Sequence, residues 1–205
     1  MTKAALVIVD VQNDFIPGGS LPVPAGDEVV PVLNRYVERF QAAELPILAT
    51  RDWHPPRTTH FRAFGGAWPQ HCVQGTRGAE FHPDLRLPES AIVISKGMGE
   101  HDDAYSGFQG FDSQGEPMAA VLRRLDVDHL YLGGLATDYC DQATALSGLA
   151  EGFPVTLLID AVRGINLKPG DIERAIAEMV RAGANVTTLE RLNLETEDRE
   201  TADAR

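Results

Sequence analysis

Short apolar runs alternate along this chain with longer segments in which apolar residues recur every three or four positions. Residues 5–9 form a continuous apolar run of strand length, whereas 27–43 carries Val30, Leu33 and Val37 at the spacing of one helix face. The two patterns keep alternating as far as residue 189. They predict strands at 5–9, 46–50, 91–95, 129–133, 155–159 and 186–189, and helices at 27–43, 118–125, 141–150 and 171–182.

This order of strands and helices predicts an α/β fold. Because βαβ units build parallel sheets, we expect a single doubly wound domain with a mainly parallel, six-stranded sheet flanked by helices. The domain is expected to cover residues 1–192. The polar segment 193–205 has no apolar spacing and is expected to form a flexible C-terminal tail.

One connection departs from the regular alternation. Residues 51–90 separate two predicted strands and are rich in Pro, Gly, His and aromatic residues without a clear period. A loop of that length inside a compact domain is usually functional. This segment is therefore a place to look for binding residues.

Charge narrows the range of partners. The 205 residues carry 18 Lys and Arg against 30 Asp and Glu, a formal net charge of −12, and no basic cluster stands out. Nucleic acid or an anionic membrane surface would require a basic face, so neither is expected as a partner. The apolar runs also fall well short of the roughly 20 residues that cross a bilayer. The oligomeric state stays open, a homo-oligomer included.

The two cysteines, Cys72 and Cys140, are too few for a disulfide framework. The short apolar run near the N-terminus ends at Asp10, below the length of a secretory signal. A reducing, cytoplasmic location is the interpretation that fits both observations. Each thiol then needs an explanation of its own.

Four chemically capable side chains follow the predicted strands. Asp10 comes after the first strand, Asp52 after the second, Lys96 after the third, and Cys140 after a short turn beyond the fourth. Ligands of open parallel sheets bind beyond the carboxyl ends of the strands. The four side chains are therefore expected at one edge of the sheet.

Cys140 lies between a strand and a helical pattern, which is a position for a nucleophile. Free amides at a helix N-terminus favour a thiolate and can also bind an oxyanion. Asp10 could accept the thiol proton and return it to a leaving amine, while Lys96 stabilises both charges. Position alone leaves a second interpretation open, because a lone cysteine is often an inert core residue and a strand-terminal Asp often caps a turn.

The long loop offers metal ligands. Asp52 and His54 lie on the same side of an extended segment, and His71 follows in the loop, with His60 also available. Three N/O ligands with open positions describe a catalytic site for Zn, Fe(II) or Mn. Spacing alone leaves this open, since loop histidines often bind nothing. Cys72 would face away from His71 and is interpreted as a packing residue.

Six short motifs occur in one order along the chain: DVQNDF at 10–15, DWH at 52–54, WPQHC at 68–72, KG at 96–97, DAYSGF at 103–108 and GLATDYC at 134–140. Together they resemble the nicotinamidases of the isochorismatase-like hydrolase superfamily, over about residues 4–189. The resemblance implies a doubly wound α/β fold. It also implies hydrolysis of a small-molecule substrate, nicotinamide, to nicotinate and ammonia through a thioester, as part of NAD salvage, with pyrazinamide as a further substrate.

The same resemblance implies roles for individual residues. It assigns Cys140 as nucleophile, Asp10 as general base and then acid, and Lys96 as their electrostatic partner. The backbone amides of Ala136 and Cys140 would form the oxyanion hole, next to a cis peptide bond between Leu135 and Ala136. Such a bond persists only where its surroundings enforce it.

A metal site and a pocket are implied in the same way. Asp52, His54 and His71 would hold one divalent ion, zinc ahead of iron or manganese, with no organic cofactor required. His60 is either a further ligand or a neighbour of the ligands. The side chains of Phe15, Trp68 and Tyr105 would form the pocket walls.

Three alternatives are weighed against this interpretation. Another cysteine amidase of the superfamily, acting on a carbamoyl or ureido compound, is the nearest, but such relatives generally lack the set Asp52, His54 and His71. Isochorismatase itself is disfavoured because that group typically lacks the nucleophilic cysteine. A catalytically silent binding or scaffold protein is disfavoured by the presence of Asp10, Lys96 and Cys140.

Overall fold

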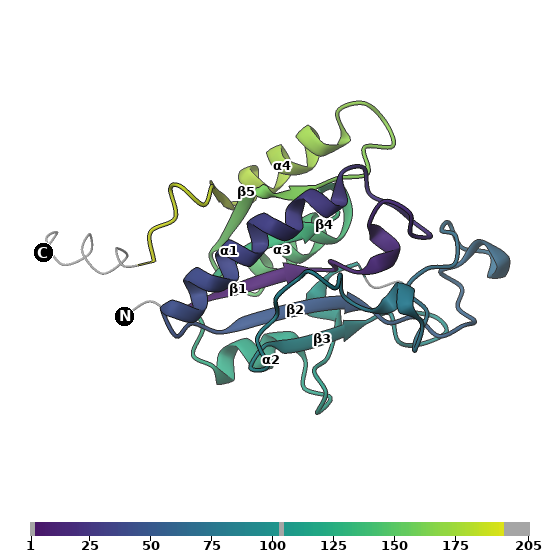
Figure 1. Cartoon of the computed structure of the whole chain (residues 1–205), viewed down its shortest axis with the longest axis horizontal. Helices are drawn as coiled ribbons and strands as arrows, with labels where there is room; N and C mark the ends of the chain where they lie inside the picture. Colours follow the sequence, from purple (N-terminus) through teal and green to yellow (C-terminus); the bar gives the residue numbers. More distant parts are fainter. Residues whose placement is uncertain (1–2, 103–104, 195–205) are drawn as a thin grey trace, which may run out of the picture.

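A parallel sheet of six strands runs through the centre of the computed structural model, which describes residues 3–102 and 105–194 (Figure 1). The strand order is β3-β2-β1-β4-β5-β6, and each neighbouring pair is parallel. The strands are β1 (Ala4–Val9), β2 (Ile47–Asp52), β3 (Ile92–Lys96), β4 (His129–Leu135), β5 (Val155–Arg163) and β6 (Asn185–Thr187). The predicted fold class is confirmed.

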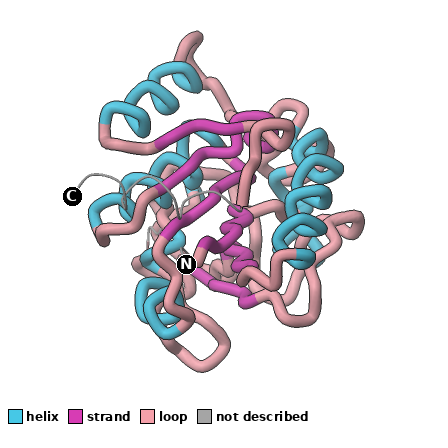
Figure 2. Tube along the Cα trace, turned by 90° about the vertical axis from the view of Figure 1, so that its left-hand side faces the viewer, coloured by secondary structure: helices cyan, strands magenta, loops and turns pink. Residues whose placement is uncertain are grey.

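Helices cover both faces of the sheet (Figure 2). They are α1 (Val29–Ala42), α2 (Met118–Arg124), α3 (Gln142–Ala150) and α4 (Asp171–Arg181). Along β1, Leu6 and Ile8 pack into the core on the α1 side, whereas Ala5 and Val7 pack into the core shared by the other three helices. Burial on both faces explains why this strand is a continuous apolar run rather than an alternating one.

Several predicted strand ends are wrong. β2 ends at Asp52 rather than at residue 50, and β4 ends at Leu135 rather than at residue 133. β5 continues to Arg163 instead of ending at residue 159, because Asp160, which interrupts its apolar run, is paired. The Asp160 carboxylate accepts hydrogen bonds from the Tyr36 hydroxyl at 2.8 Å and from the Leu189 amide at 2.9 Å. The last strand, β6, ends at Thr187, and Leu189 packs into the α1-side core beyond it.

Two helix starts also differ from the prediction. The first pattern divides into a 3-10 turn, Gly26–Glu28, followed by α1. The pattern at 141–150 is preceded by a π-helical turn, Thr137–Asp141, which leads directly into α3. Single π turns are frequent at functional sites, and this one carries Cys140.

The long connection between β2 and β3 folds over the carboxyl ends of those strands (Figure 1). It contains two 3-10 turns, Arg62–Phe64 and Arg77–Ala79. Single β-bridges join His54 to Val73 and Phe61 to Trp68. These internal contacts give an irregular segment a defined path above the sheet edge.

The predicted flexible tail falls almost wholly on residues 195–205, outside the described residues. In the part of the chain that the structure describes, no helix is long and apolar enough to cross a membrane.

Candidate active site

The sequence-predicted side chains meet where the strand order reverses, between β1 and β4. Asp10 follows β1 directly, Asp52 and Lys96 are the last residues of β2 and β3, and Cys140 lies in the π turn after β4. A reversal of this kind opens a crevice at the carboxyl edge of the sheet. Asp10 has a φ of 50°, a left-handed conformation that is costly and concentrates at functional sites.

Lys96 is the centre of this group. Its Nζ forms an ion pair with Asp10 Oδ2 at 2.8 Å, donates to the Asp52 carboxylate, and lies 3.5 Å from Cys140 Sγ. Thr50 Oγ1 donates to the other oxygen of Asp10 at 2.6 Å. Because Lys96 is only 1% exposed, its charge depends on these two carboxylates for compensation.

The two carboxyl groups differ in how readily they take up a proton. Burial raises the pKa of Asp10 above its ordinary value, and the nearby charge of Lys96 only partly offsets this. Burial acts in the same direction on Asp52, but the charge of Lys96, with smaller contributions from the neighbouring His54 and His71, holds the pKa of Asp52 well below its usual range. Paired groups with opposite shifts have separable roles. Asp10 can exchange protons, and Asp52 stays ionised.

The Cys140 thiol keeps its proton in this arrangement. Burial raises its pKa well above the ordinary value; Lys96 lowers it, while Asp10 and Asp52 raise it. The start of a helix was expected to favour a thiolate at Cys140, but burial and two carboxylates act the other way. The Asp10 oxygen and the Cys140 sulfur lie within 4.8 Å of each other, so a proton can pass between them when the sulfur reacts.

The peptide bond between Leu135 and Ala136 is cis. It connects the end of β4 to the π turn, and Ala136 and Cys140 both line the same pocket. The two residues whose amides were assigned to an oxyanion hole therefore lie beside the thiol.

Three histidines of the long loop converge next to Asp52. His54, His60 and His71 each offer one ring nitrogen, and these atoms lie within 4.8 Å of one another. Nε2 of His54 and Nε2 of His71 are 3.7 Å and 3.8 Å from Asp52 Oδ2. Two ligands at about 2.1 Å from one ion are at most about 4.2 Å apart, so both separations fit a shared ion.

Hydrogen bonds fix two of these imidazole rings. Nδ1 of His54 faces the Gly97 carbonyl at 3.0 Å, and Nδ1 of His71 faces the Pro69 carbonyl at 2.8 Å. A carbonyl accepts from N–H, so each Nδ1 carries the proton and each Nε2 presents a lone pair, as metal-binding histidines do. Nε2 of His54 is buried and finds no hydrogen-bond partner among the described residues. The donor set therefore fits a divalent metal.

Gly97 permits this arrangement. It has a φ of 64°, and a Cβ at this position would lie 2.5 Å from Cε1 of His54. The carbonyl of a residue with a side chain could not approach the ring in the same way. This is a physical reason for glycine after Lys96.

His60 belongs to the same cluster. Its ring is stacked on that of His54, with centroids 4.7 Å apart, and it lines the pocket together with His71. Cys72 lies elsewhere, fully buried in the α1-side core, where burial raises its pKa well above the ordinary value. The interpretation of Cys72 as a packing residue agrees with this position.

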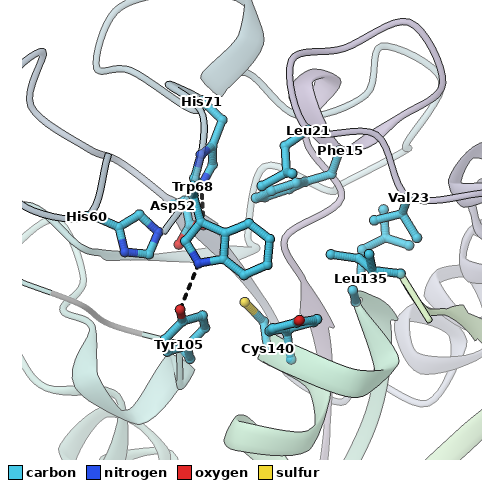
Figure 3. Close-up of a pocket in the computed structure, with 13 residues that line it drawn as sticks. Phe15, Leu21, Val23, Asp52, His60, Trp68, His71, Tyr105, Leu135 and Cys140 are labelled. Atoms are coloured by element: carbon cyan, nitrogen blue, oxygen red, sulfur yellow. Dashed lines mark hydrogen bonds and ion pairs between the residues drawn. The ribbon is translucent and has the colours of Figure 1, made fainter. Parts of the chain in front are cut away.

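A pocket lined mainly by apolar and aromatic side chains joins the thiol to the histidines (Figure 3). Phe15, Trp68 and Tyr105 line it, and Trp68 Nε1 donates to the Tyr105 hydroxyl at 2.8 Å. Figure 3 shows the Cys140 sulfur pointing into the pocket. Five further lining residues were not singled out from the sequence: Leu21, Val23, Leu135, Tyr139 and Ile165. Leu135 and Tyr139 lie within the GLATDYC motif, but the others are loop residues that no pattern distinguishes.

A parallel α/β fold with a cysteine, an aspartate and a lysine at its switch point defines a class of hydrolase site. Residues 4–191 match the Isochorismatase domain family. The chain belongs to this family, and the resemblance stated from its motifs is confirmed.

Individual relatives cover nearly the whole chain. A nicotinamidase of Escherichia coli is 38% identical over 207 residues, covering 92% of this chain and 96% of that protein. A pyrazinamidase of Pyrococcus horikoshii, solved in complex with zinc, is 48% identical with a TM-score of 0.84, covering 91% of this chain and 99% of the other. The protein PnC1 of L. infantum, solved in complex with nicotinate, is 33% identical with a TM-score of 0.83, covering 94% and 96%.

Proposed function

We propose that this protein hydrolyses nicotinamide to nicotinate and ammonia, with pyrazinamide as a second substrate. One observation carries the proposal. The same apolar pocket is lined by the Cys140 thiol, which lies 3.5 Å from the buried Lys96 ammonium, and by two histidines of the three-histidine cluster. Such a pocket suits a flat heteroaromatic ring, with its carboxamide at the thiol and its ring nitrogen toward the histidines. The similarity to a nicotinamidase and to a protein solved with nicotinate supports the same substrate.

The chemistry follows from the proton positions. Asp10 takes the proton of Cys140 as the sulfur attacks the carboxamide carbon, and the resulting oxyanion is held by the amides of Ala136 and Cys140. Asp10 then gives the proton to the departing nitrogen, which leaves as ammonia. A water molecule, deprotonated by Asp10, hydrolyses the thioester and restores the thiol with its proton. Lys96 stabilises the negative charge on Asp10 and on the sulfur.

Asp52, His54 and His71 are proposed to hold one divalent ion, with His60 as a further ligand. The buried, unpartnered Nε2 of His54 supports this assignment, and zinc is the first candidate because a similar pyrazinamidase was solved with it. When bound, the ion would supply an electrophilic site for the ring nitrogen and for water. The mechanism uses no organic cofactor. A cytoplasmic location is proposed as well, since both cysteines are free thiols.

The proposal is tested by measuring ammonia released from nicotinamide by the purified protein, with pyrazinamide and an N-carbamoyl amino acid as comparators. Release from nicotinamide and pyrazinamide, with little from the carbamoyl compound, is expected. A preference for the carbamoyl compound would instead identify an amidase for ureido substrates. No release from any of the three by zinc-loaded protein would contradict an amidase function.

A further inference from the structure

Asp138 has no part in the chemistry above, yet it lies two residues before Cys140 in the same π turn. Its carboxylate accepts two backbone hydrogen bonds from a distant segment. Oδ1 accepts from the amide of Ile165 at 2.9 Å, and Oδ2 accepts from the amide of Asn166 at 2.7 Å. The turn that carries the thiol is therefore bound to the connection between β5 and α4.

This connection, residues 164–170, packs tightly against the turn. A Cβ on Gly164 would lie 2.8 Å from Asp138 Oδ1 and 2.5 Å from Cγ1 of Ile172. Such distances are too short for a side chain, so the contact requires glycine. The carboxylate is in direct van der Waals contact with the chain that it binds.

The far end of the connection is fixed as well. Asn166 has a φ of 54°, and its Oδ1 accepts from the amide of Asp171 at 3.0 Å. The Asp171 carboxylate accepts from the amide of Lys168 at 2.7 Å. The connection is therefore held at Ile165 and Asn166 by Asp138, and at its far end by bonds among its own residues.

One of these residues forms part of the pocket. Ile165 lines the same pocket as Cys140, and it packs against the α1-side core. A wall built on a free loop would move, and the pocket would accept rings of different sizes. Here the wall is attached to the turn that carries the nucleophile.

We propose that Asp138 is a positioning residue that holds Ile165 as the size-limiting wall of the pocket, so that the site accepts an unsubstituted six-membered heteroaromatic carboxamide and rejects bulkier ring-substituted ones. This inference rests on the proposed function. Ile165 contacts the ring, and Asp138 acts through Ile165.

The test compares kcat and KM for nicotinamide and for a ring-methylated nicotinamide. Asp138→Asn replaces one acceptor oxygen with an NH2 group that faces an amide N–H. We expect KM for nicotinamide to rise about tenfold, in keeping with the loss of a charge-assisted hydrogen bond, while kcat changes less than about threefold. The preference for the unsubstituted ring should fall about fivefold or more, a loss of the size expected for one methyl group in a pocket.

Two further variants separate the role of Ile165 as the pocket wall from the role of Asp138 in holding it. Ile165→Ala should relax the preference as strongly, with residues 164–170 still tied to the turn. Asp112→Asn is the control, because Oδ1 of Asp112 also accepts from two loop amides, those of Gln114 and Glu116 at 2.8 Å each, and Asp112 does not line the pocket. It should leave KM, kcat and the preference unchanged.

Hydrogen exchange gives a readout that is independent of activity. Exchange at the amides of Ile165 and Asn166 should become faster in Asp138→Asn and stay slow in Ile165→Ala. Unchanged exchange at these two amides in Asp138→Asn would overturn the inference. So would an equal fall of kcat and kcat/KM in this variant if the preference for the unsubstituted ring stayed the same. If the wild-type protein hydrolysed a different amide, the proposed function would fail, but the exchange result would still support or overturn the role of Asp138 in holding Ile165.

Discussion

The ammonium nitrogen of Lys96 lies 3.5 Å from the sulfur of Cys140. The same nitrogen binds the carboxylates of Asp10 and Asp52, so one buried cation neutralises two acids beside the thiol. Its own pKa is well above the ordinary value: burial opposes the charge, but Asp10, Asp52 and Cys140 outweigh that effect. The lysine therefore carries its charge at neutral pH.

Replacing Lys96 by Met is expected to abolish ammonia release and to destabilise the fold. Two buried carboxylates would lose their cation, a change that typically costs about 3 to 5 kcal/mol. Urea unfolding would measure the loss, with ammonia release measured in the same samples. Arg123→Met is the control, because it breaks an exposed pair with Glu151. If Lys96→Met unfolded like Arg123→Met, the central role of the lysine in compensating these charges would be refuted.

The two cysteines should respond differently to replacement by Ala. Cys140→Ala is expected to abolish hydrolysis and keep the fold, because the nucleophile is lost at the pocket wall. Cys72→Ala should keep most of the activity but lower the free energy of unfolding by about 1 kcal/mol, since it leaves a small cavity in the core. Both are measured by ammonia release and urea unfolding. Equal losses of activity would contradict the assignment of Cys140.

Metal content should depend on the histidine cluster. Purified wild-type protein is expected to retain about one divalent ion per chain. His54→Ala should lose most of it, because the ligand Nε2 and the hydrogen bond from Nδ1 that orients the ring disappear together. Elemental analysis measures this directly. His60→Ala should lower the metal content as well, as expected for the proposed further ligand. His82→Ala is the control, because His82 is outside the cluster and its ring accepts from the Asp84 amide in its own loop. Full metal retention in His54→Ala would remove the proposed site.

Asp141 gives a prediction about stability and pH. Both of its oxygens are buried without a hydrogen-bond partner in the described structure, and burial raises its pKa well above the ordinary value, with Asp10 and Asp138 adding to this and Lys96 opposing it. Because the pKa is raised in the folded state, the contribution of Asp141 to the free energy of unfolding is most favourable at low pH and is lost as the pH rises through the folded-state pKa. Asp141→Asn should therefore become more stable relative to the parent as pH increases.

The measurement is urea unfolding of both proteins at about pH 5 and about pH 8. The advantage of Asp141→Asn should grow over this interval by about 1 kcal/mol or more, the usual cost of an unpartnered buried group. A constant difference between the two proteins would show that Asp141 does not change its protonation between folded and unfolded states.

The sequence predicted the fold because burial on both faces gives strands such as β1 an unmistakable apolar run. The predicted strand end was wrong where a polar residue inside a strand is hydrogen-bonded to distant parts of the chain. Asp160 looks like the end of a strand, and only the distant hydroxyl of Tyr36 and amide of Leu189 allow β5 to continue through it. The end of a parallel strand locates Asp10 or Lys96 by a general rule, which is why these positions could be found without a structure.

Other parts of the site had no local signal. Ile165 is one of many apolar loop residues, and its place in the pocket depends on Asp138, 27 residues earlier in the chain. The rings of His60 and His54 are stacked because of the path that the long loop takes. The 3-10 turns and single bridges of this loop depend on long-range contacts. Spacing along the chain contains no information of this kind.

Lys96 and Gly97 connect the acid-base centre around Cys140 with the histidine cluster. The side chain of the first residue touches the reacting sulfur, and the carbonyl of the second sets the proton position on a metal-binding imidazole. An insertion or deletion within this dipeptide would shift both groups at once. A change in the length of this strand end therefore cannot alter the acid-base centre without also altering the histidine cluster.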